Sequence, residues 1–397
     1  MHRYFSGERP AGFRGWFAAA TVIVAVAALS SAAQAQPDHD QARGPDRGLR
    51  INEVQAIATH NSYHREVSFV EQKFMEEKFP DFRDLLYSHA SLRQQFDRQR
   101  ARGIELDVYP DPQGGLYADP LIRRAAQLPA PADAELEKPG FKVLHVADFD
   151  YRSSCVTLRS CLTQVKEWSE RRPGHVTVPI LLELKQTDPV LEELGGVKSP
   201  PWDTAQLDAL DAEIRTVFPD EATVTADDIR DEGRTLEQSV LEHGWPRVSQ
   251  SRGKVMFLME NDDRRIQDAY RAGGRESLQG RVLFTSSEAG RPDAAFMNVD
   301  DPTGAERAVV QDLVRRGYFV RTNADGALKE AATGDTRMLT DALASGAQMV
   351  STDFPAPGLA ARYGSDYVAE LPGTTGPVRC NPVNVRKWQC PRSPLEP

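Results

Sequence analysis

Short apolar runs recur along the chain, and stretches with a helical pattern separate several of them. The runs cover Val54–Ser62, Gly103–Tyr109, Val143–Val146, His175–Lys185, Gly253–Glu260, Arg281–Ser286, Tyr318–Asn323 and Ala347–Asp353. Near-continuous apolar runs are typical of parallel strands that are covered on both faces. A 3.6-residue period marks Thr157–Arg171, Thr204–Phe218, Ala305–Arg316 and Asp335–Ser345, and Gly346 follows as a left-handed helix cap would. Eight strands with intervening helices predict an α/β fold, a single-domain (β/α)8 TIM-type barrel rather than an open doubly wound sheet.

Polar residues lie at or near the carboxyl ends of these runs. They are His60, Asn61, Glu105, Asp107, His145, Glu183, Lys185, Glu260, Arg321 and Asp353. In TIM barrels this end of the strands carries the active site, whereas the opposite end serves stability. Two connections are long, Pro110–Gly140 after the second predicted strand and Gln186–Arg252 after the fourth. Long connections on the catalytic side often build substrate selectivity, and Trp202 in the second one is either an interfacial side chain or packed under its own loop.

The first residues have the features of a signal peptide. Three arginines and an apolar run from Trp16 to Leu29 precede Ala33-Gln34-Ala35, which matches a small-residue cleavage site. The run is too short to span a bilayer comfortably, although a non-cleaved anchor is the alternative. We therefore expect residues 1–35 to be removed, the polar residues 36–50 to form a flexible lead-in, and residues 51–397 to form a secreted or periplasmic domain.

Net charge excludes one class of partner. The chain carries a net charge of −10, and without residues 1–35, which hold three basic and one acidic residue, the charge becomes −12. An acidic protein is a poor candidate for nucleic acid, and an anionic membrane repels it unless a cation intervenes. We expect a monomer that binds no nucleic acid.

The four cysteines form two close pairs, Cys155 with Cys161 and Cys380 with Cys390. An even number suits an oxidising compartment, and neither spacing is that of a zinc motif. The sequence predicts two local disulfides, the second of which staples the C-terminal tail; buried free thiols are the alternative.

Two histidines and an acidic pair supply the candidate chemistry. His60 and His145 stand at matching places on two predicted strands, where a pair of imidazoles can transfer protons. Glu105 and Asp107 are two residues apart and so point to the same face of their strand. We interpret His64 as a loop residue or a partner of a catalytic group, and His89, His175 and His243 as structural or exposed.

The acidic residues predict a metal site. Two inward carboxylates without a cation would repel each other, so a bound metal accounts for them better than a structural ion pair with arginine. The predicted ligands are Asn61, Glu105, Asp107 and Glu183. An all-oxygen set suits Ca²⁺, or Mg²⁺ as second choice, and argues against zinc. Lys185 either binds phosphate or neutralises Glu183, and Arg321 is a further phosphate-binding candidate. The sequence assigns no role to Asp353 or to the acidic residues of the fifth strand.

Five segments together resemble a known family. They are ATHNSYH (58–64), GIELDVYPDPQGG (103–115), FKVLHVADFD (141–150), PILLELK (179–185) and STDFP (351–355). The chain resembles the phosphatidylinositol-specific phospholipase C-like phosphodiesterase superfamily from about Ile51 to Arg362, and within it the calcium-dependent secreted phosphoinositide phospholipases C of bacteria and fungi. The resemblance implies a TIM-type barrel, catalytic histidines at positions 60 and 145, and calcium ligands at positions 61, 105, 107 and 183. The family's inositol-reading residues are not recognisable in the predicted strands five to seven.

The resulting hypothesis is a secreted phosphoric diester hydrolase. Acting as a calcium-dependent phosphoinositide phospholipase C, it would cleave phosphatidylinositol to diacylglycerol and inositol phosphate, with peripheral membrane contact left open. His60 would hydrogen-bond the phosphoryl oxygen, His145 would protonate the departing oxygen, and Lys185 would add positive charge near the phosphate. The alternatives are a glycerophosphodiester phosphodiesterase or a sphingomyelinase-D-like lipase, and, in another class, a non-catalytic exported binding protein, against which the intact histidine pair argues.

Overall fold

The computed structural model describes residues 48–78, 82–326, 328–374, 376–391 and 393–396. The predicted signal peptide and most of the predicted lead-in therefore lie outside the described residues. The last residues of the lead-in are part of the folded unit: Leu49 is buried and its carbonyl accepts a hydrogen bond of 2.8 Å from Val248 N. Arg50 forms an antiparallel bridge with Arg247.

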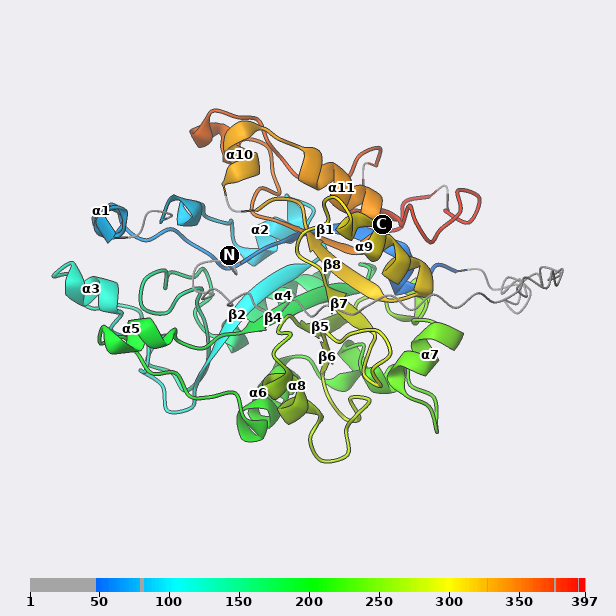
Figure 1. Ribbon diagram of the computed structural model, residues 1–397, viewed down its shortest axis with the longest axis horizontal. Helices are drawn as coiled ribbons and strands as arrows, with labels where there is room; N and C mark the ends of the chain where they lie inside the picture. Colours follow the sequence, from blue (N-terminus) through cyan, green and yellow to red (C-terminus); the bar gives the residue numbers. More distant parts are fainter. Residues whose placement is uncertain (1–47, 79–81, 327, 375, 392, 397) are drawn as a thin grey trace, which may run out of the picture. The chain divides into compact units, whose positions relative to one another are not determined.

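In the described part of the chain, the strands form two five-stranded sheets, ordered β10-β1-β9-β8-β7 and β3-β2-β4-β5-β6 (Figure 1). The strands are β1 (Val54–Thr59), β2 (Ile104–Asp111), β3 (Gly140–Val143), β4 (Val178–Leu184), β5 (Val255–Met259), β6 (Leu283–Thr285), β7 (Phe296–Asn298), β8 (Phe319–Asn323), β9 (Met349–Thr352) and β10 (Val378–Cys380). All neighbours pair in parallel except β3 with β2 and β10 with β1. The fold is thus a mixed α/β fold with two parallel-rich sheets.

Backbone hydrogen bonds cross from one sheet to the other at two places. Beside β1 and β2, Arg102 N donates to Ile57 O at 2.8 Å and Thr59 N donates to Gly103 O at 3.2 Å. Beside β6 and β7, Ser286 forms a parallel bridge with Phe296, and Ser287 N donates to Phe296 O at 3.2 Å. The carboxyl ends of the parallel strands in both sheets therefore lie on the same side.

The third predicted strand, Val143–Val146, is wrong in its bounds and in its direction: the observed β3 shares only Val143 with it. β3 runs antiparallel to β2, with Val143 opposite Val108 and Gly140 opposite Asp111, so it is not the third parallel strand. A buried ion pair of 2.7 Å between Lys142 Nζ and Asp111 Oδ2 stabilises this antiparallel pairing. A parallel partner would need a crossover helix, and the connection holds only the five-residue helix α3 (Leu121–Ala125). The parallel strand that the sequence analysis missed is β7, whose three residues are too few to show a pattern.

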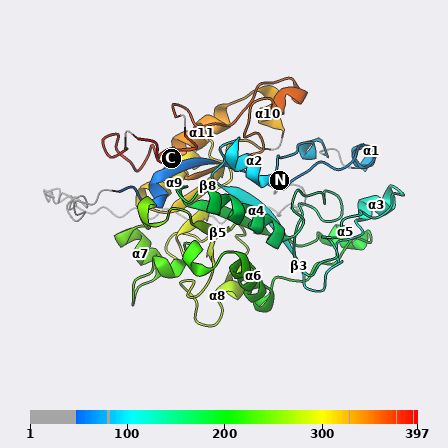
Figure 2. The ribbon, with the colours of Figure 1, turned by 180° about the vertical axis from the view of Figure 1, so that it is seen from behind.

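Some helices, such as α4 (Leu158–Arg171), lie beside the strands, whereas others lie together at one side of the molecule (Figure 2). Besides α3 and α4, the helices are α1 (Phe69–Lys78), α2 (Leu92–Asp97), α5 (Pro189–Glu193), α6 (Thr204–Val217), α7 (Leu236–His243), α8 (Arg264–Arg271), α9 (Glu306–Arg316), α10 (Lys329–Thr333) and α11 (Arg337–Ser345). Short 3₁₀ helices are η2 (Ile51–Glu53), η3 (Phe82–Leu85), η4 (Asp220–Ala222), η5 (Ala226–Asp228), η6 (Val248–Gln250) and η7 (Leu359–Tyr363). The four predicted helices are confirmed as α4, α6, α9 and α11, and Gly346 is in the left-handed region with φ 81°. Between β6 and β7 the described chain contains no helix, so the strand–helix alternation is incomplete there.

Two further predictions are confirmed by local packing. Disulfides join Cys155 to Cys161 and Cys380 to Cys390. Trp202 is buried, stacks on Phe141 with ring centroids 5.6 Å apart, and donates its indole N–H to Lys185 O. Of the two interpretations of Trp202, packing under its own loop is therefore correct.

Candidate active site

His60 follows the last residue of β1, where its ring meets two carboxylates. His60 Nδ1 lies 2.9 Å from Asp353 Oδ1, and Nε2 lies 3.5 Å from Glu105 Oε1. The His60 side chain is 24% exposed, whereas those of Asp353 and Glu105 are 4% and 1% exposed, so the ring separates the two acids from solvent. Burial by itself lowers the pKa of His60, but Glu105 and Asp353 outweigh it and raise that pKa to about 10. Because its pKa is raised, the His60 ring keeps its protons and donates hydrogen bonds.

His145 lies just beyond β3, where Asp150 fixes its orientation. Asp150 Oδ2 lies 2.8 Å from His145 Nδ1 and 2.7 Å from His64 Nε2, and all three side chains are nearly fully buried. His64 also stacks on Tyr87 at 4.3 Å. Burial raises the pKa of Asp150, but the two histidines outweigh it and hold this pKa well below its usual range. Burial lowers the pKa of His145, and the hydrogen bond to Asp150 opposes that shift.

The predicted metal ligands come from neighbouring strand ends. Asp107 on β2 stands opposite Glu183 on β4, so their side chains are neighbours on the same face. Lys185 Nζ lies 3.0 Å from Glu183 Oε2 and 3.3 Å from Asp107 Oδ2. Asn61 is buried, its φ of 44° is one that asparagine tolerates, and its Oδ1 accepts a hydrogen bond of 3.3 Å from Tyr63. Lys185 therefore neutralises Glu183, as one of its two interpretations expected, and contacts Asp107 as well.

This group of oxygens fits a divalent cation. Both carboxylate oxygens of Asp107 are buried and accept no hydrogen bond, which is costly for an ionised acid. Burial raises the pKa of Asp107 well above its ordinary value; Lys185 lowers it, and Glu183 and Glu105 raise it further. A hard cation with oxygen ligands relieves this repulsion, and carboxylate and amide oxygens are the ligands that calcium takes.

Arg321 on β8 contacts the predicted ligand Glu105, and each of its guanidinium nitrogens has a partner. Its Nη2 is 2.7 Å from Glu105 Oε2, its Nε donates to Ser351 Oγ at 3.0 Å, and its Nη1 contacts Asp300. The side chain is 1% exposed. In this structure Glu105 thus has the arginine partner that the sequence analysis considered as the alternative to a metal.

The sequence analysis missed or left unassigned the residues that orient the histidines. Asp353 received no role, and Asp150 was not singled out although it stands in the ADFD segment. His89, expected to be structural or exposed, is buried with its Nε2 2.8 Å from the His60 carbonyl oxygen. The signal that could have found Asp150 is its position five residues after His145, within reach of a tight loop.

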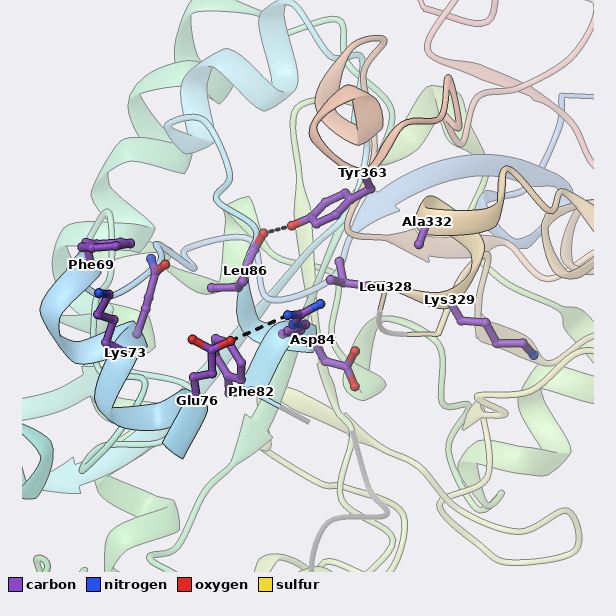
Figure 3. A pocket seen from close by; sticks show the side chains of 12 residues that line it. Phe69, Lys73, Glu76, Phe82, Asp84, Leu86, Leu328, Lys329, Ala332 and Tyr363 are labelled. Carbon is purple, nitrogen blue, oxygen red and sulfur yellow. Dashed lines mark hydrogen bonds and ion pairs between the residues drawn. The ribbon is translucent and has the colours of Figure 1, made fainter. Parts of the chain in front are cut away.

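A cavity of about 700 Å³ lies outside this site, between α1, η3, α10 and η7 (Figure 3). Tyr363, which lines it, donates a hydrogen bond to the carbonyl of Leu86, and Phe69 and Lys73 also line the cavity. None of the histidines or predicted metal ligands lines it. The candidate catalytic groups and ligands therefore lie outside this cavity.

No helix of the described residues combines the length and the apolar character needed to cross a membrane.

Comparison with protein families finds one match. A family model described as phosphoinositide phospholipase C, Ca²⁺-dependent, matches residues 49–382. No curated protein sequence matches the chain.

Among solved structures, the chain is similar to a calcium-dependent phosphoinositol-specific phospholipase C from a Gram-negative Pseudomonas species. The identity is 14%, the TM-score is 0.49, and 84% of this chain and 96% of that chain are covered. It is also similar to a Ca²⁺-dependent phosphatidylinositol-specific phospholipase C from Streptomyces antibioticus, with 16% identity, a TM-score of 0.46, and coverage of 79% and 97%. A glycerophosphoryl diester phosphodiesterase from Parabacteroides distasonis has 12% identity, a TM-score of 0.29, and coverage of 79% and 86%.

Proposed function

Because the chain belongs to the calcium-dependent phosphoinositide phospholipase C family and is thus a phosphoric diester hydrolase, we propose that it cleaves phosphatidylinositol between phosphate and glycerol. The products are diacylglycerol and an inositol phosphate. The observation that carries the proposal is the meeting of two carboxylate-oriented histidines with Asp107, whose buried oxygens accept no hydrogen bond.

We propose one closed barrel of eight parallel strands as the scaffold. The hydrogen bonds from Arg102 to Ile57 and from Ser287 to Phe296 support closure between β1 and β2 and between β6 and β7. In such a barrel the carboxyl strand ends form one mouth. The catalytic groups then act on a single bound substrate.

Asn61, Glu105, Asp107 and Glu183 are the proposed calcium ligands. The chemistry that calcium supplies when bound is neutralisation of a phosphate oxygen and a lower pKa for an attached hydroxyl group. The Glu105 and Asp107 carboxylates are the groups placed to accept the proton of the attacking inositol hydroxyl. Lys185, with its ammonium between Asp107 and Glu183, keeps positive charge beside the phosphate.

The two histidines divide the remaining work. Asp353 fixes Nδ1 of His60, and Nε2, which lies 3.5 Å from Glu105 Oε1, is the proposed hydrogen-bond donor to the phosphoryl oxygen as negative charge grows on it. Asp150 fixes Nδ1 of His145 in the same way, which leaves Nε2 to protonate the departing diacylglycerol oxygen. Attack by an inositol hydroxyl forms a cyclic inositol phosphate, and water opens the ring afterwards.

Export is proposed from two features. The predicted signal peptide precedes the domain, and two disulfides are typical of an oxidising compartment such as the periplasm or the cell exterior.

A substrate panel tests the function. The purified protein is assayed on phosphatidylinositol, phosphatidylcholine, sphingomyelin and glycerophosphoinositol, each with calcium, with magnesium and with excess chelator. We expect diacylglycerol only from phosphatidylinositol and only with a divalent cation, with calcium the more effective. Choline release from sphingomyelin, or hydrolysis of glycerophosphoinositol alone, would assign the protein to one of the alternative activities, and turnover in chelator would contradict the calcium site.

A further inference from the structure

Asp325 is a buried carboxylate that the proposed catalytic steps do not use. It lies two residues beyond the carboxyl end of β8 and is 6% exposed. β8 pairs in parallel with β9, whose last residue, Thr352, is followed directly by Asp353. Because the two strands end side by side, Asp325 lies next to the residue that fixes His60.

Three hydrogen-bond donors converge on the Asp325 carboxylate. Its Oδ1 accepts the backbone N–H of Asp353 at 3.1 Å, and its Oδ2 accepts the hydroxyl groups of Thr352 and, at 3.0 Å, of Tyr367. The Thr352 hydroxyl in turn accepts the backbone N–H of Phe354 at 2.9 Å. Asp325 thus holds the backbone at Asp353 directly and, through the Thr352 hydroxyl, the backbone at the next residue.

These hydrogen bonds act on the carboxylate that orients His60. Asp353 Oδ1 lies 2.9 Å from His60 Nδ1 and 3.8 Å from His89 Nε2, and the Asp353 side chain is 4% exposed. The direction of a side chain in its preferred rotamer depends on the backbone that carries it. A shift of the backbone at Asp353 would therefore move its carboxylate relative to the His60 ring.

The two neighbouring acids, Asp325 and Asp353, differ in their electrostatic surroundings. Burial and the Asp353 carboxylate raise the pKa of Asp325 to about 7, against three hydrogen bonds that lower it. Burial also raises the pKa of Asp353, but His60 outweighs it and holds this pKa well below its usual range. Buried acids with strongly shifted pKa values concentrate at functional sites, which favours a functional reason for the acid at position 325.

We propose that Asp325 is a positioning residue: by holding the backbone at Asp353, it fixes the carboxylate that orients the His60 ring. The proposal rests on the proposed function, in which His60 donates a hydrogen bond to the phosphoryl oxygen. Acting through Asp353, Asp325 affects how well His60 stabilises the charge on the phosphate and not how the leaving group is protonated. Loss of Asp325 therefore lowers kcat to the same extent whatever the leaving group.

Two substitutions of Asp325 in the mature chain test this role. Asparagine keeps an oxygen that can accept the Asp353 N–H, whereas alanine does not. We expect Asp325→Ala to lower kcat about 10- to 100-fold, on phosphatidylinositol and on an analogue with a nitrophenol leaving group alike, and Asp325→Asn to stay near wild type. The matched control is Asp211→Ala, which removes another buried acid that accepts a tyrosine hydroxyl, from Tyr270 on α8, and leaves kcat unchanged.

A double-mutant cycle with His60→Ala shows whether Asp325 acts through His60. We expect Asp325→Ala to cause no further loss of kcat in a His60→Ala chain. Additive losses, or a loss confined to phosphatidylinositol, overturn the proposal. Should Asp325→Ala not fold, Thr352→Val, which removes the hydroxyl that joins Asp325 to the Phe354 N–H, takes its place with the same expectations.

The NMR resonance of the His60 Nδ1 proton gives a readout that does not depend on turnover. It is measured in the mature chain without calcium and is identified by its absence from His60→Ala. We expect this resonance to shift or disappear in Asp325→Ala and to remain in Asp325→Asn and Asp211→Ala. An unchanged resonance in Asp325→Ala overturns the proposal. If phosphatidylinositol is not hydrolysed, the proposed function fails, while the resonance still decides whether Asp325 positions His60.

Discussion

Asp150 Oδ2 accepts hydrogen bonds from two histidine rings, one of which is the proposed general acid. Three charged groups act on His145: Asp150 raises its pKa, whereas Lys185 and His64 lower it. Burial adds to the lowering, and the pKa of His145 lies below its usual value. A general acid must be protonated, so activity on lipid is lost as the pH rises through that pKa.

Substitutions of the two partners of His145 shift this pH dependence in opposite directions. Asp150→Asn removes the negative charge that favours the protonated ring, so the alkaline limb of the pH–rate profile moves to lower pH. His64→Phe keeps the stacking on Tyr87 but removes a positive charge, so the limb moves to higher pH. A charge at this distance changes a pKa by about one unit or more.

Profiles of kcat/KM against pH for the two variants and wild type measure the shifts. If the substitutions only loosened the loop, both variants would lose activity without opposite shifts of the alkaline limb. A shift of the alkaline limb in the same direction in both variants would contradict the role of Asp150.

The leaving group separates the roles of the two histidines. His145→Ala should lose about 10²–10⁴-fold in rate on lipid, whose alkoxide needs a proton, and much less on an analogue with a nitrophenol leaving group. His60→Ala should impair both substrates alike, because the charge that it stabilises develops on phosphate oxygens in either case. Single-turnover rates on the two substrates check this; equal losses for His145→Ala would leave it as a positioning residue.

At the scale of elements, the pairing of β2 with β4 sets Asp107 beside Glu183. Asp107→Asn removes one negative charge from a crowded group. We expect it to raise the calcium concentration for half-maximal activity at least tenfold and to reduce the increase in Tm that calcium produces. In chelator its Tm should equal or exceed that of wild type, because a buried carboxylate without a hydrogen bond is gone.

Thermal unfolding with and without calcium gives both values. Glu193→Gln, an exposed acid on α5, is the control and should leave the calcium response unchanged. An unaltered response in Asp107→Asn would exclude Asp107 from the ligands.

The disulfides act on short segments. Each closes a short loop, six residues apart in one case and ten in the other, so removal of either by paired Cys→Ser changes should lower the free energy of unfolding by about 2–3 kcal/mol. Denaturant unfolding of the two double variants measures this. Cys155 follows the His145 loop and Cys161 lies in the first turn of α4, so loss of this disulfide should also slow turnover, whereas loss of Cys380–Cys390 should not. Equal effects on turnover would contradict this distinction.

At the scale of the whole molecule, removal of residues 1–35 accompanies export and makes the net charge more negative. A domain that works outside the cytoplasm should be found without residues 1–35. Mass spectrometry of the native exported protein should give an N-terminus within a few residues of Gln36, and an intact Met1 in the mature protein would contradict the predicted signal peptide. With net charge near −12 after cleavage, long-range attraction to anionic lipid is absent.

Local patterns were enough to predict much of this molecule. Apolar runs and 3.6-residue periods predicted the strands β1, β2, β4, β5, β6, β8 and β9 and the helices α4, α6, α9 and α11, because each depends on residues that are near in sequence. Both disulfides were predictable for the same reason. Alternation along β2 placed Glu105 and Asp107 on one face, and both are buried there.

Contacts between residues far apart in the chain decided the strand directions and the partners of the histidines. An apolar run indicates which residues are covered but not which way its neighbour runs, so the antiparallel direction of β3 and the role of the three-residue β7 followed only from the assembled sheets. The carboxylate that orients His60 is 293 residues away in the chain, and the one that joins His64 to His145 is 86 residues from His64. The sequence by itself was enough to nominate the two histidines and the candidate ligand carboxylates, but not Asp150 or Asp353. The tertiary structure decided which carboxylate holds which ring, because a hydrogen bond depends on distance in space and a strand period carries no information about that distance.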